Sequence, residues 1–324
     1  MQTLPKSLVY NATLVHRGDL TDLLGIFRVQ PDPQDGVASP SESTVPVFAA
    51  GQYAVLGANN ELQPEKGAIR RAYSIGSPPY EQRWLEFYVR YVDQPTSPNP
   101  FTHLLWQMGE GSRLWLGPKI TGRFTMRDTL EPEDTRLRLF VAAGTGLAPF
   151  VSMVMQADRD GEFGAGEPPN CALLHGASHP SDLGYQSDLE ALMNRVEQRY
   201  FPSISRPHLH PEWQGDTGRV EDYFTSGKLA ELESRLGREP GFISPENCAV
   251  YVCGLQGTIA ETVKRLLPRG FVPDNRRIRE ALKLPAKLPP TLFFEQYDTT
   301  PILDLHDREL MASLQASYLS SASS

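Results

Sequence analysis

A short glycine turn, Gly144-Thr145-Gly146, constrains the fold of this chain more than any other feature of its sequence. The apolar run at residues 136–142 leads into this turn and is expected to form a strand; residues 150–157 are expected to form a helix. Glycines let a ligand approach the backbone, and the positive end of the following helix points at that ligand. Taken alone, the turn is either a pyrophosphate site or an ordinary structural turn.

Two more apolar segments of the same half, residues 171–175 and 249–253, are expected to be buried strands, and residues 187–199 between them have a helical pattern. Uniformly apolar strands that alternate with helices are typical of a parallel sheet. Ligands bind at the carboxyl ends of such strands, where Cys253 and Gly254 are placed. Cys253 is either part of a binding site or a small core residue. Residues 129–298 are therefore predicted to form a doubly wound α/β domain with flanking helices.

The first half, residues 1–128, alternates short β-rich runs with connections rich in Pro, Gly, Asp and Asn. This pattern is typical of an antiparallel barrel or sandwich with few long helices. The acidic residues 130–134 mark the boundary between the halves, and residues 31–46 are expected to form a surface loop. The segments expected to be strands are residues 7–15, 23–29, 52–56, 84–92 and 112–116.

Composition excludes several classes of protein. A net charge of −8 argues against general nucleic-acid binding, and no apolar run approaches the roughly 20 residues that span a bilayer. Residues 1–10 lack the apolar block of a secretion signal. Cys171, Cys248 and Cys253 lie in apolar runs, and their odd number argues against disulfides and against a four-thiolate metal or iron–sulfur site. We expect a cytoplasmic protein without a bound metal.

Residues 70–78 of the first half include side chains suited to a flavin. On a strand, Arg71 and Tyr73 point to one face and Ser74 to the other. A guanidinium can clamp a pyrophosphate, a phenol ring can stack on a flat heterocycle, and a hydroxyl can hydrogen-bond to a flavin nitrogen. The alternative is an edge strand with a solvated arginine and a packed tyrosine. Thr102, at the start of a predicted helix, is either an anion ligand or an ordinary N-cap.

Four motifs, in their order along the chain, resemble the FAD-binding barrel of the ferredoxin–NADP⁺ reductase family. They are residues 50–53, residues 71–74, residues 87–89 and Thr102. The resemblance is to bacterial members, spans residues 45–297 of this chain and implies a Greek-key β-barrel that binds FAD.

The resemblance also implies roles for single residues. Arg71 and Thr102 are expected to hold the pyrophosphate of FAD, Tyr73 to stack on the flavin and Ser74 to hydrogen-bond near its N5. The further FAD contacts that it implies are Ala72, Tyr88 and Val89, with Tyr88 near the adenosine half.

In the second half the same resemblance favours the binding interpretation of the glycine turn. Gly144, Thr145 and Gly146 are then expected to contact the pyrophosphate of NADP(H). Cys253 and Gly254 are expected beside the reacting carbon of the nicotinamide, where the cysteine is not a nucleophile.

A preference for NADP over NAD also follows from the resemblance. Tyr185 is expected to stack on the adenine, and Arg206 and Arg219 match basic positions near the 2′-phosphate. The sequence departs from the bacterial members at Ser178, where an arginine is common. The alternative is that both arginines are exposed surface charges.

The family closes with an aromatic residue over the flavin, and residues 293–297 resemble that segment. Tyr297 is the expected aromatic residue, and Glu295 is a candidate proton donor. The chain departs from the family because 27 residues follow Tyr297, and these include the predicted C-terminal extension at residues 299–324. Apolar residues at helical spacing in this tail predict a helix that covers the adenine end of FAD or packs on the surface: Met311, Leu314 and Tyr318.

The stretch between Lys264 and Lys287 has eight basic and two acidic residues, hence a local charge of +6 in an acidic chain. Most such runs are solvated faces. The alternative is a docking surface for an acidic carrier such as ferredoxin or flavodoxin.

The sequence thus predicts a ferredoxin (or flavodoxin)–NADP⁺ reductase with FAD and NADP(H) as cofactors. Its predicted catalytic residues are Ser74, Cys253, Glu295 and Tyr297. Two alternatives stay open: an NAD(P)H-dependent reductase that serves an oxygenase or reduces free flavin, and a non-enzymatic flavin-binding redox subunit. The oligomeric state is open, with a monomer as the expectation.

Overall fold

The computed structural model describes residues 7–33, 45–95, 97, 99–162, 169–285, 287–297 and 300–321. The chain divides into two compact units. The first unit holds the residues up to Asp128 together with Ala148–Gln156, and the second holds Thr129–Leu147 and the residues from Ala157 on. Most of the loop predicted at residues 31–46, and the predicted boundary at residues 298–299, lie outside the described residues.

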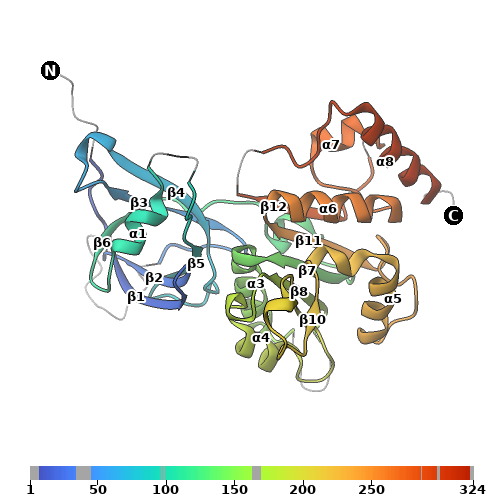
Figure 1. Cartoon of the computed structure of the whole chain (residues 1–324), viewed down its shortest axis with the longest axis horizontal. Coiled ribbons are helices and arrows are strands. Elements are labelled where there is room, and N and C mark those ends of the chain that lie inside the picture. Colours follow the sequence, from blue (N-terminus) through green and yellow to red (C-terminus); the bar gives the residue numbers. More distant parts are fainter. Residues whose placement is uncertain are drawn as a thin grey trace. The chain divides into compact units, whose positions relative to one another are not determined.

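The first unit is built on a six-stranded antiparallel sheet in the order β4-β3-β6-β1-β2-β5, which confirms the strand-rich prediction for this half (Figure 1). The backbone N–H of Gly76 donates to the carbonyl of Glu86 at 2.8 Å, so the outermost strands, β4 and β5, meet and the sheet curls. The strands are β1 (Ala12–Thr21), β2 (Leu24–Pro31), β3 (Tyr53–Asn59), β4 (Ala68–Ser74), β5 (Leu85–Arg90) and β6 (Arg113–Leu116).

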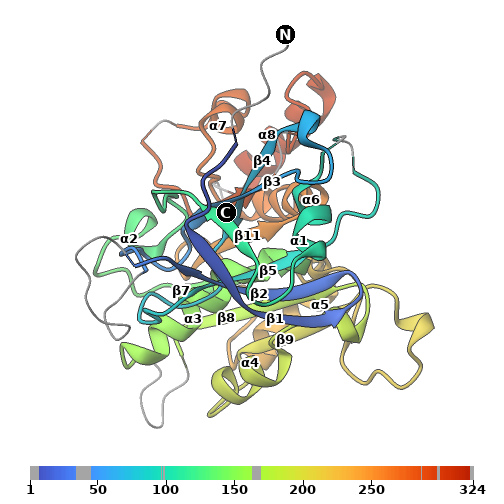
Figure 2. The ribbon, with the colours of Figure 1, turned by 90° about the vertical axis from the view of Figure 1, so that its left-hand side faces the viewer.

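The core of this unit follows from alternation along the strands. In β2, buried and half-buried side chains alternate from Ile26 on, and the inward-facing Phe27 and Val29 pack with Phe87 and Phe101. The β1–β2 hairpin is the long blue ribbon of Figure 2. The short helices of the unit are η1 (Pro64–Lys66), α1 (Phe101–Gln107) and, at its boundary, α2 (Met126–Thr129).

The second unit is built on a six-stranded sheet in the order β10-β9-β8-β7-β11-β12, in which every pair is parallel. This confirms the predicted parallel sheet. Every residue of β11 is buried, as expected for a strand covered on both faces. The strands are β7 (Leu137–Ala143), β8 (Cys171–Ala177), β9 (Tyr200–Ile204), β10 (Asp216–Thr217), β11 (Cys248–Gly254) and β12 (Leu292–Gln296).

Helices flank this sheet, with α4 and α6 on opposite sides in Figure 1. Alternate residues of β7 and β11, among them Leu139, Val141, Val250 and Val252, pack with apolar residues of α5 to α8 in one core. The helices are η2 (Gly144–Leu147), α3 (Ala148–Arg159), η3 (Pro180–Asp182), α4 (Gln186–Met193), η4 (Pro207–Leu209), η5 (Val220–Phe224), α5 (Ser226–Arg235), α6 (Gln256–Leu266), η6 (Leu267–Arg269), α7 (Arg276–Ala281) and α8 (Arg308–Ser321).

One helix boundary was predicted wrongly. The helical pattern at residues 187–199 extends six residues too far, since α4 ends at Met193. The side chain of Asn194 accepts the backbone N–H groups of Arg199 and Tyr200, both at 2.9 Å, and so closes a non-helical return into β9.

The helix predicted in the C-terminal tail is confirmed as α8, which contacts η6. Met311, Leu314 and Tyr318 are buried in the core of the second unit, so this helix completes that core. Among the described residues, no helix has the length and apolar character required to cross a membrane.

Candidate functional site

The centre of the second sheet is a point where the strand order reverses. From β7 the chain continues to β8 on one side, while β11 lies on the other side of β7. A crevice opens outside the carboxyl ends of the strands at such a point. The Gly144–Leu147 turn follows β7, and Cys253 and Gly254 end β11, so these predicted residues lie at this position. A Cβ atom on Gly146 would lie 2.1 Å from the carbonyl oxygen of Cys253, which shows how closely the two segments pack.

The two glycines of the turn differ in their surroundings. Gly146 needs the absence of a side chain for packing, whereas a Cβ atom on Gly144 would meet nothing within 4 Å. Gly144 has a φ of +55° and begins η2, which continues into α3. The first backbone N–H groups of a helix lack intrahelical acceptors. An open backbone with free donors at a helix start fits a pyrophosphate.

Cys253 and Tyr297 meet beside this turn. The Cys253 thiol, which is fully buried, donates to the Tyr297 hydroxyl at 3.1 Å, and that hydroxyl lies 3.5 Å from the carbonyl of Thr145. Glu295 is the register partner of Cys253 across the β11–β12 pair. Three chain segments therefore bring together three of the four predicted catalytic residues; Ser74 belongs to the other unit.

Burial raises the pKa of the Cys253 thiol well above its usual range, and the charge of Glu295 raises this pKa further. The thiol is therefore neutral at physiological pH, in line with the expectation that it is not a nucleophile. The Tyr297 side chain is 48% exposed, so its ring lies at the surface of this unit.

In the first unit, the predicted flavin residues lie on the outermost strand β4. Arg71 is exposed and donates to the carbonyl of Arg70 at 2.8 Å. Tyr73 is half-buried and packs against Phe101 at 5.7 Å between ring centroids. Burial raises the pKa of the Tyr73 phenol above its ordinary range, which keeps the hydroxyl neutral. An exposed guanidinium near a partly covered aromatic ring fits the phosphate and ring ends of a flavin nucleotide.

Most of the other predicted residues of this unit are more enclosed. Ser74, Tyr88 and Val89 are buried, while Ala72 is exposed. Thr102 is the second residue of α1, whose N-cap is Pro100. Its hydroxyl accepts the N–H of Val92 at 3.2 Å, so Thr102 secures a loop and is not an N-cap. An accepting hydroxyl keeps its own proton for donation to an anion.

Three neighbouring strand ends of the second unit hold the residues predicted to select NADP. The N–H of Ser205 donates to Ala177 and the N–H of Gly218 to Ile204, each at 2.9 Å. These bonds join the ends of β8, β9 and β10, which Ser178, Arg206 and Arg219 follow.

Both arginines of this group are exposed, and Arg219 lies 3.7 Å from Glu221. Tyr185 has a φ of +60°, a left-handed conformation that costs a non-glycine residue about 1 kcal/mol. Backbone strain of this kind is concentrated at functional sites.

The structure adds two histidines that the sequence did not single out. His179 Nδ1 lies 2.8 Å from His210 Nε2. In the chain, His179 directly follows Ser178, and His210 is near Arg206. The signal in the sequence that could have identified them is their position, because each follows a strand of the parallel sheet within a few residues.

The basic stretch between Lys264 and Lys287 is largely paired within the protein. Four of its cations form ion pairs, which are Lys264 with Glu261, Arg265 with Asp222, Arg269 with Glu233 and Arg276 with Glu280. Arg279 donates to the carbonyl of Leu288. Among the described residues, Arg277, Lys283 and Lys287 have no ion pair.

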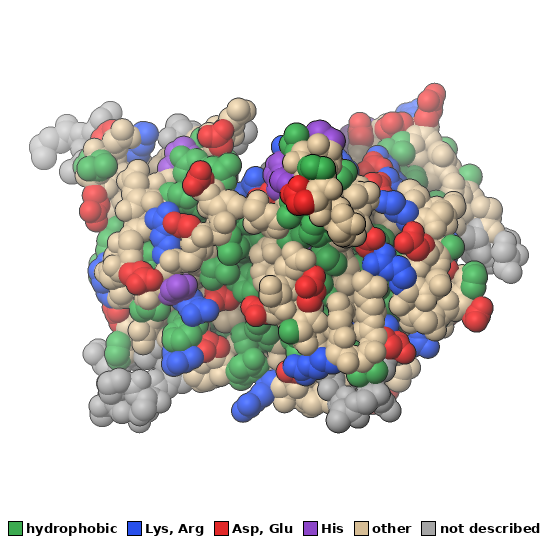
Figure 3. All heavy atoms as spheres, turned by 60° about the horizontal axis from the view of Figure 1, so that its bottom comes forward, with side chains coloured by type: hydrophobic (Ala, Val, Ile, Leu, Met, Phe, Trp, Pro, Cys, Tyr) green, Lys and Arg blue, Asp and Glu red, His purple; other side chains and the backbone are tan. Residues whose placement is uncertain are grey.

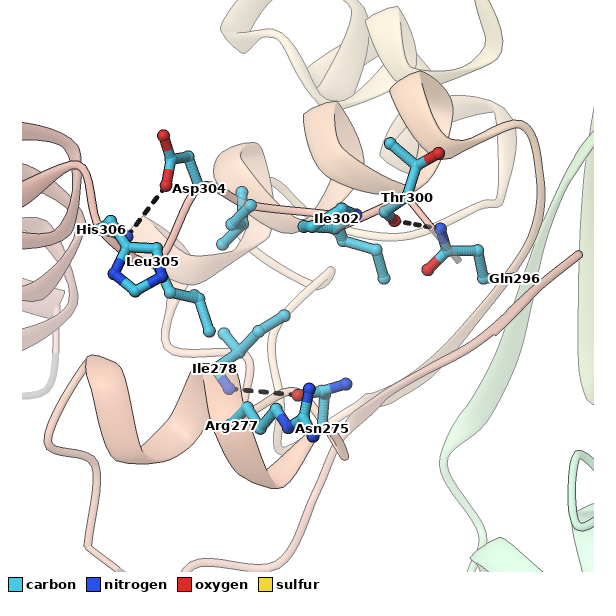
Figure 4. A pocket seen from close by; sticks show the side chains of 11 residues that line it. Asn275, Arg277, Ile278, Gln296, Thr300, Ile302, Asp304, Leu305 and His306 are labelled. Atoms are coloured by element: carbon cyan, nitrogen blue, oxygen red, sulfur yellow. Dashed lines mark hydrogen bonds between the residues drawn. The ribbon is translucent and has the colours of Figure 1, made fainter. Parts of the chain in front are cut away.

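A pocket of about 700 Å³ lies between the start of α7 and the segment that follows β12 (Figure 4). Asn275 and Arg277 approach it from one side, and Ile302 and His306 from the other. The Gln256 side chain donates to the carbonyls of Pro301 and Ile302, which fixes this wall to the start of α6. Within the described residues, no cluster of three metal-ligating side chains is present.

Comparison with known proteins gives relatives for both units together. Residues 140–264 match the oxidoreductase NAD-binding domain family. The chain is 29% identical over 250 residues to a ferredoxin–NADP reductase of Azotobacter vinelandii, with 72% of this chain and 86% of that protein covered. It is 31% identical over 255 residues to a flavodoxin/ferredoxin–NADP reductase of Rhodobacter capsulatus, with 72% and 85% covered.

A solved structure has the same fold. It is a ferredoxin NADP⁺ reductase from Neisseria gonorrhoeae with bound FAD and NADP, 22% identical, with a TM-score of 0.66. The match covers 89% of this chain and 98% of that chain, so it includes both sheets.

Proposed function

The chain belongs to the ferredoxin–NADP reductase family, and from that premise we propose that it transfers electrons between NADPH and ferredoxin or flavodoxin, with FAD as its cofactor. One observation supports this most directly. The glycine turn, the buried Cys253 and the exposed Tyr297 meet at the reversal point of a parallel sheet. That arrangement joins a phosphate site to a wall of uncharged side chains, as a pyridine dinucleotide requires.

FAD, when bound, would supply the redox chemistry, which is hydride exchange with the nicotinamide and single-electron exchange with the carrier. The protein binds and orients. Gly144 and the N–H groups at the start of η2 bind the dinucleotide pyrophosphate, and Arg206 and Arg219 bind the 2′-phosphate. Tyr185 stacks on the adenine.

In the first unit, Arg71 and Thr102 hold the pyrophosphate of FAD. Tyr73 would stack on the flavin ring, and Ser74 would donate a hydrogen bond near N5. Ala72 and Val89 would be further contacts of FAD, and Tyr88 would lie near its adenosine half. The exposed guanidinium of Arg71 and the neutral phenol of Tyr73 support these roles.

Around the nicotinamide, the protein residues position rings and protons. The Cys253 thiol orients Tyr297 through its hydrogen bond and, because it stays protonated, places no negative charge beside the ring. Glu295, level with Cys253 on the next strand, would act as the proton donor of the site once its carboxylate has taken up a proton from solvent. Tyr297 is the aromatic residue that we assign to cover a bound flavin.

Only part of the basic stretch between Lys264 and Lys287 is assigned to docking of the carrier, because several of its cations already form ion pairs within the protein. Arg277, Lys283 and Lys287, which have no ion pair within the described part of the chain, are the members that we assign to an acidic partner. Cations and carboxylates are interspersed on the face of the molecule in Figure 3, so no single-sign field covers that face. All three cysteines are free and buried, which suits a reducing cytoplasm.

The test is an absorption titration of the purified protein with NADPH, followed by steady-state assays with ferricyanide and with ferredoxin. We expect a flavin spectrum that bleaches on addition of NADPH, and reduction of both acceptors. A colourless protein that does not retain added FAD would refute the proposal. A strong preference for NADH would refute the roles of Arg206 and Arg219, and activity with ferricyanide alone would refute the proposed carrier.

A further inference from the structure

His179 and His210 form a hydrogen-bonded imidazole pair at the edge of the second sheet. Their nitrogens, Nδ1 and Nε2, are 2.8 Å apart, and the rings meet edge to face with centroids separated by 5.1 Å. The residues are 31 positions apart and lie on the loops that follow β8 and β9. Both side chains are half-buried, so each has some access to solvent.

A carboxylate next to the pair sets the direction of its hydrogen bonds. Nδ1 of His210 lies 3.4 Å from Glu212, and an ionised carboxylate only accepts hydrogen bonds. The negative charge of Glu212 favours the tautomer of His210 that has its proton on Nδ1, and in that tautomer Nε2 accepts the hydrogen bond from His179 Nδ1–H. In the neutral pair this leaves Nε2 of His179 without a proton. One further proton converts His179 into a cation with a donor at Nε2.

The pair lies where α/β dinucleotide sites read the ribose. In these folds, the group that reads the ribose 2′ position lies near the end of the strand that follows the glycine turn, here β8. Arg206 and Arg219 follow the neighbouring strand ends, and Ser178 supplies no charge there. His179 is the next residue after Ser178.

From this placement we propose that His179, backed by His210 and Glu212, binds the 2′-phosphate of NADP(H) and takes up a proton from solvent as it does so. The inference rests on the proposed function of the second unit as an NADP(H) site. No covalent bond is made or broken: the proton that arrives on Nε2 is shared with a phosphate oxygen. A dinucleotide without the 2′-phosphate takes up no proton at this site.

The charged groups on the surrounding elements are consistent with this proton uptake. Glu212 faces His210, and Asp182 of η3 donates its backbone N–H to the carbonyl of His179. Arg206 precedes η4, and Arg219 has Glu221 as its neighbour at 3.7 Å. The negative charge of Glu212 faces the pair, and the two arginines attract the phosphate.

The test is calorimetry on the full-length flavin-loaded protein at pH 7.5, in two buffers of different ionisation enthalpy. The probes are 2′,5′-ADP and 5′-AMP, which differ by the 2′-phosphate alone. We expect proton uptake with 2′,5′-ADP and none with 5′-AMP. His179→Gln should abolish this uptake and weaken 2′,5′-ADP binding on the order of tenfold. Binding of 5′-AMP should not change.

His208→Gln is the matched control, since His208 is exposed on the same loop. It should retain both the proton uptake and the affinity of the unmodified protein. Glu212→Gln changes an exposed side chain and should reduce the uptake at pH 7.5.

Two results would overturn the inference: equal affinities for the two probes, or unchanged uptake in His179→Gln. Reduction of the flavin by NADPH, measured separately, shows whether the proposed function itself has failed.

Discussion

The buried thiol of Cys253 holds the hydroxyl of the exposed Tyr297 at 3.1 Å, and the same hydroxyl lies 3.5 Å from the carbonyl of Thr145. This contact joins the end of β11, the residue after β12 and the glycine turn. The proposed role of the cysteine, to position Tyr297, requires a hydrogen-bond donor and no negative charge.

Replacement of the thiol tests that role. Cys253→Ala removes the donor, and we expect flavin reduction by NADPH to slow by about tenfold, the equivalent of about 1.4 kcal/mol. Cys253→Ser keeps a donor and should restore most of the rate. Stopped-flow absorption measures both. Cys171→Ala, at a buried cysteine on β8, should retain the full rate; an unchanged rate in Cys253→Ala would contradict the assignment.

Thiol labelling tests the ionisation of all three cysteines. Burial raises the pKa of Cys171 and of Cys248 to about 12, and that of Cys253 well above its usual range. At pH 8 the native protein should therefore give no prompt reaction with a disulfide reagent, while three thiols react in denaturant. Prompt labelling of one thiol in the native protein would show that its surroundings are open.

Much of the second unit was predictable because its signals are local. An apolar strand, a glycine turn and a helix are adjacent in the chain, so Gly144 and Gly146 could be placed before the structure was known. The contact between Cys253 and Tyr297 was not predictable in that way. It depends on the parallel register of β11 and β12, which chain spacing does not specify.

The ion pairs of the basic stretch between Lys264 and Lys287 were likewise not predictable from the sequence. Its local charge follows from the sequence, but the partners that neutralise it are distant in the chain: Asp222 pairs with Arg265 and Glu233 with Arg269. The pairing of His179 with His210 could not be predicted from the sequence, because it depends on which strands are neighbours in the sheet.

The pH dependence of stability tests the buried His175 on β8. Burial lowers its pKa to about 3, and its Nδ1 lies 2.8 Å from the Tyr200 hydroxyl. Below pH 6.5 the unfolded chain binds a proton that the folded protein does not. As the pH is lowered from 6.5 toward 3, the free energy of unfolding should therefore decrease by up to about 1.4 kcal/mol for each pH unit.

Urea unfolding between pH 7 and pH 5 measures this slope. The double variant His175→Leu, Tyr200→Phe removes both polar partners and should flatten it, because no group then titrates at this position. His208→Gln, at an exposed histidine, should leave the contribution of His175 in place. An equally steep slope in the double variant would assign the acid sensitivity to other groups.

The two glycines of the turn should fail in different ways. In Gly146→Ala the new Cβ would lie 2.1 Å from the Cys253 carbonyl oxygen. We therefore expect the free energy of unfolding to decrease by roughly 3 kcal/mol. Gly144→Ala meets open space and should lose only about 1 kcal/mol, from its positive φ. Its main effect should be weaker NADPH binding, measured by titration of the flavin spectrum.

Gly227→Ala is the control, since this glycine lies in α5 and an added Cβ atom would meet nothing within 4 Å. It should be neutral or stabilising by up to about 1 kcal/mol. Equal losses of stability in the two turn variants would mean that the different surroundings of Gly144 and Gly146 have no energetic effect.

Charge reversal tests carrier docking. Arg277→Glu and Lys283→Glu change cations without an ion pair in the described part of the chain, so the double variant should raise the KM for ferredoxin, on the order of tenfold at low salt. The effect should shrink as ionic strength rises, because salt screens exposed charges. NADPH oxidation with ferricyanide should not change. Arg276→Glu is the matched control: Arg276 is the next residue on the same helix, but Glu280 already pairs with it at 2.7 Å. An effect of Arg276→Glu as large as that of Arg277→Glu alone, which changes the net charge by the same amount, would indicate a response to net charge and no defined docking site.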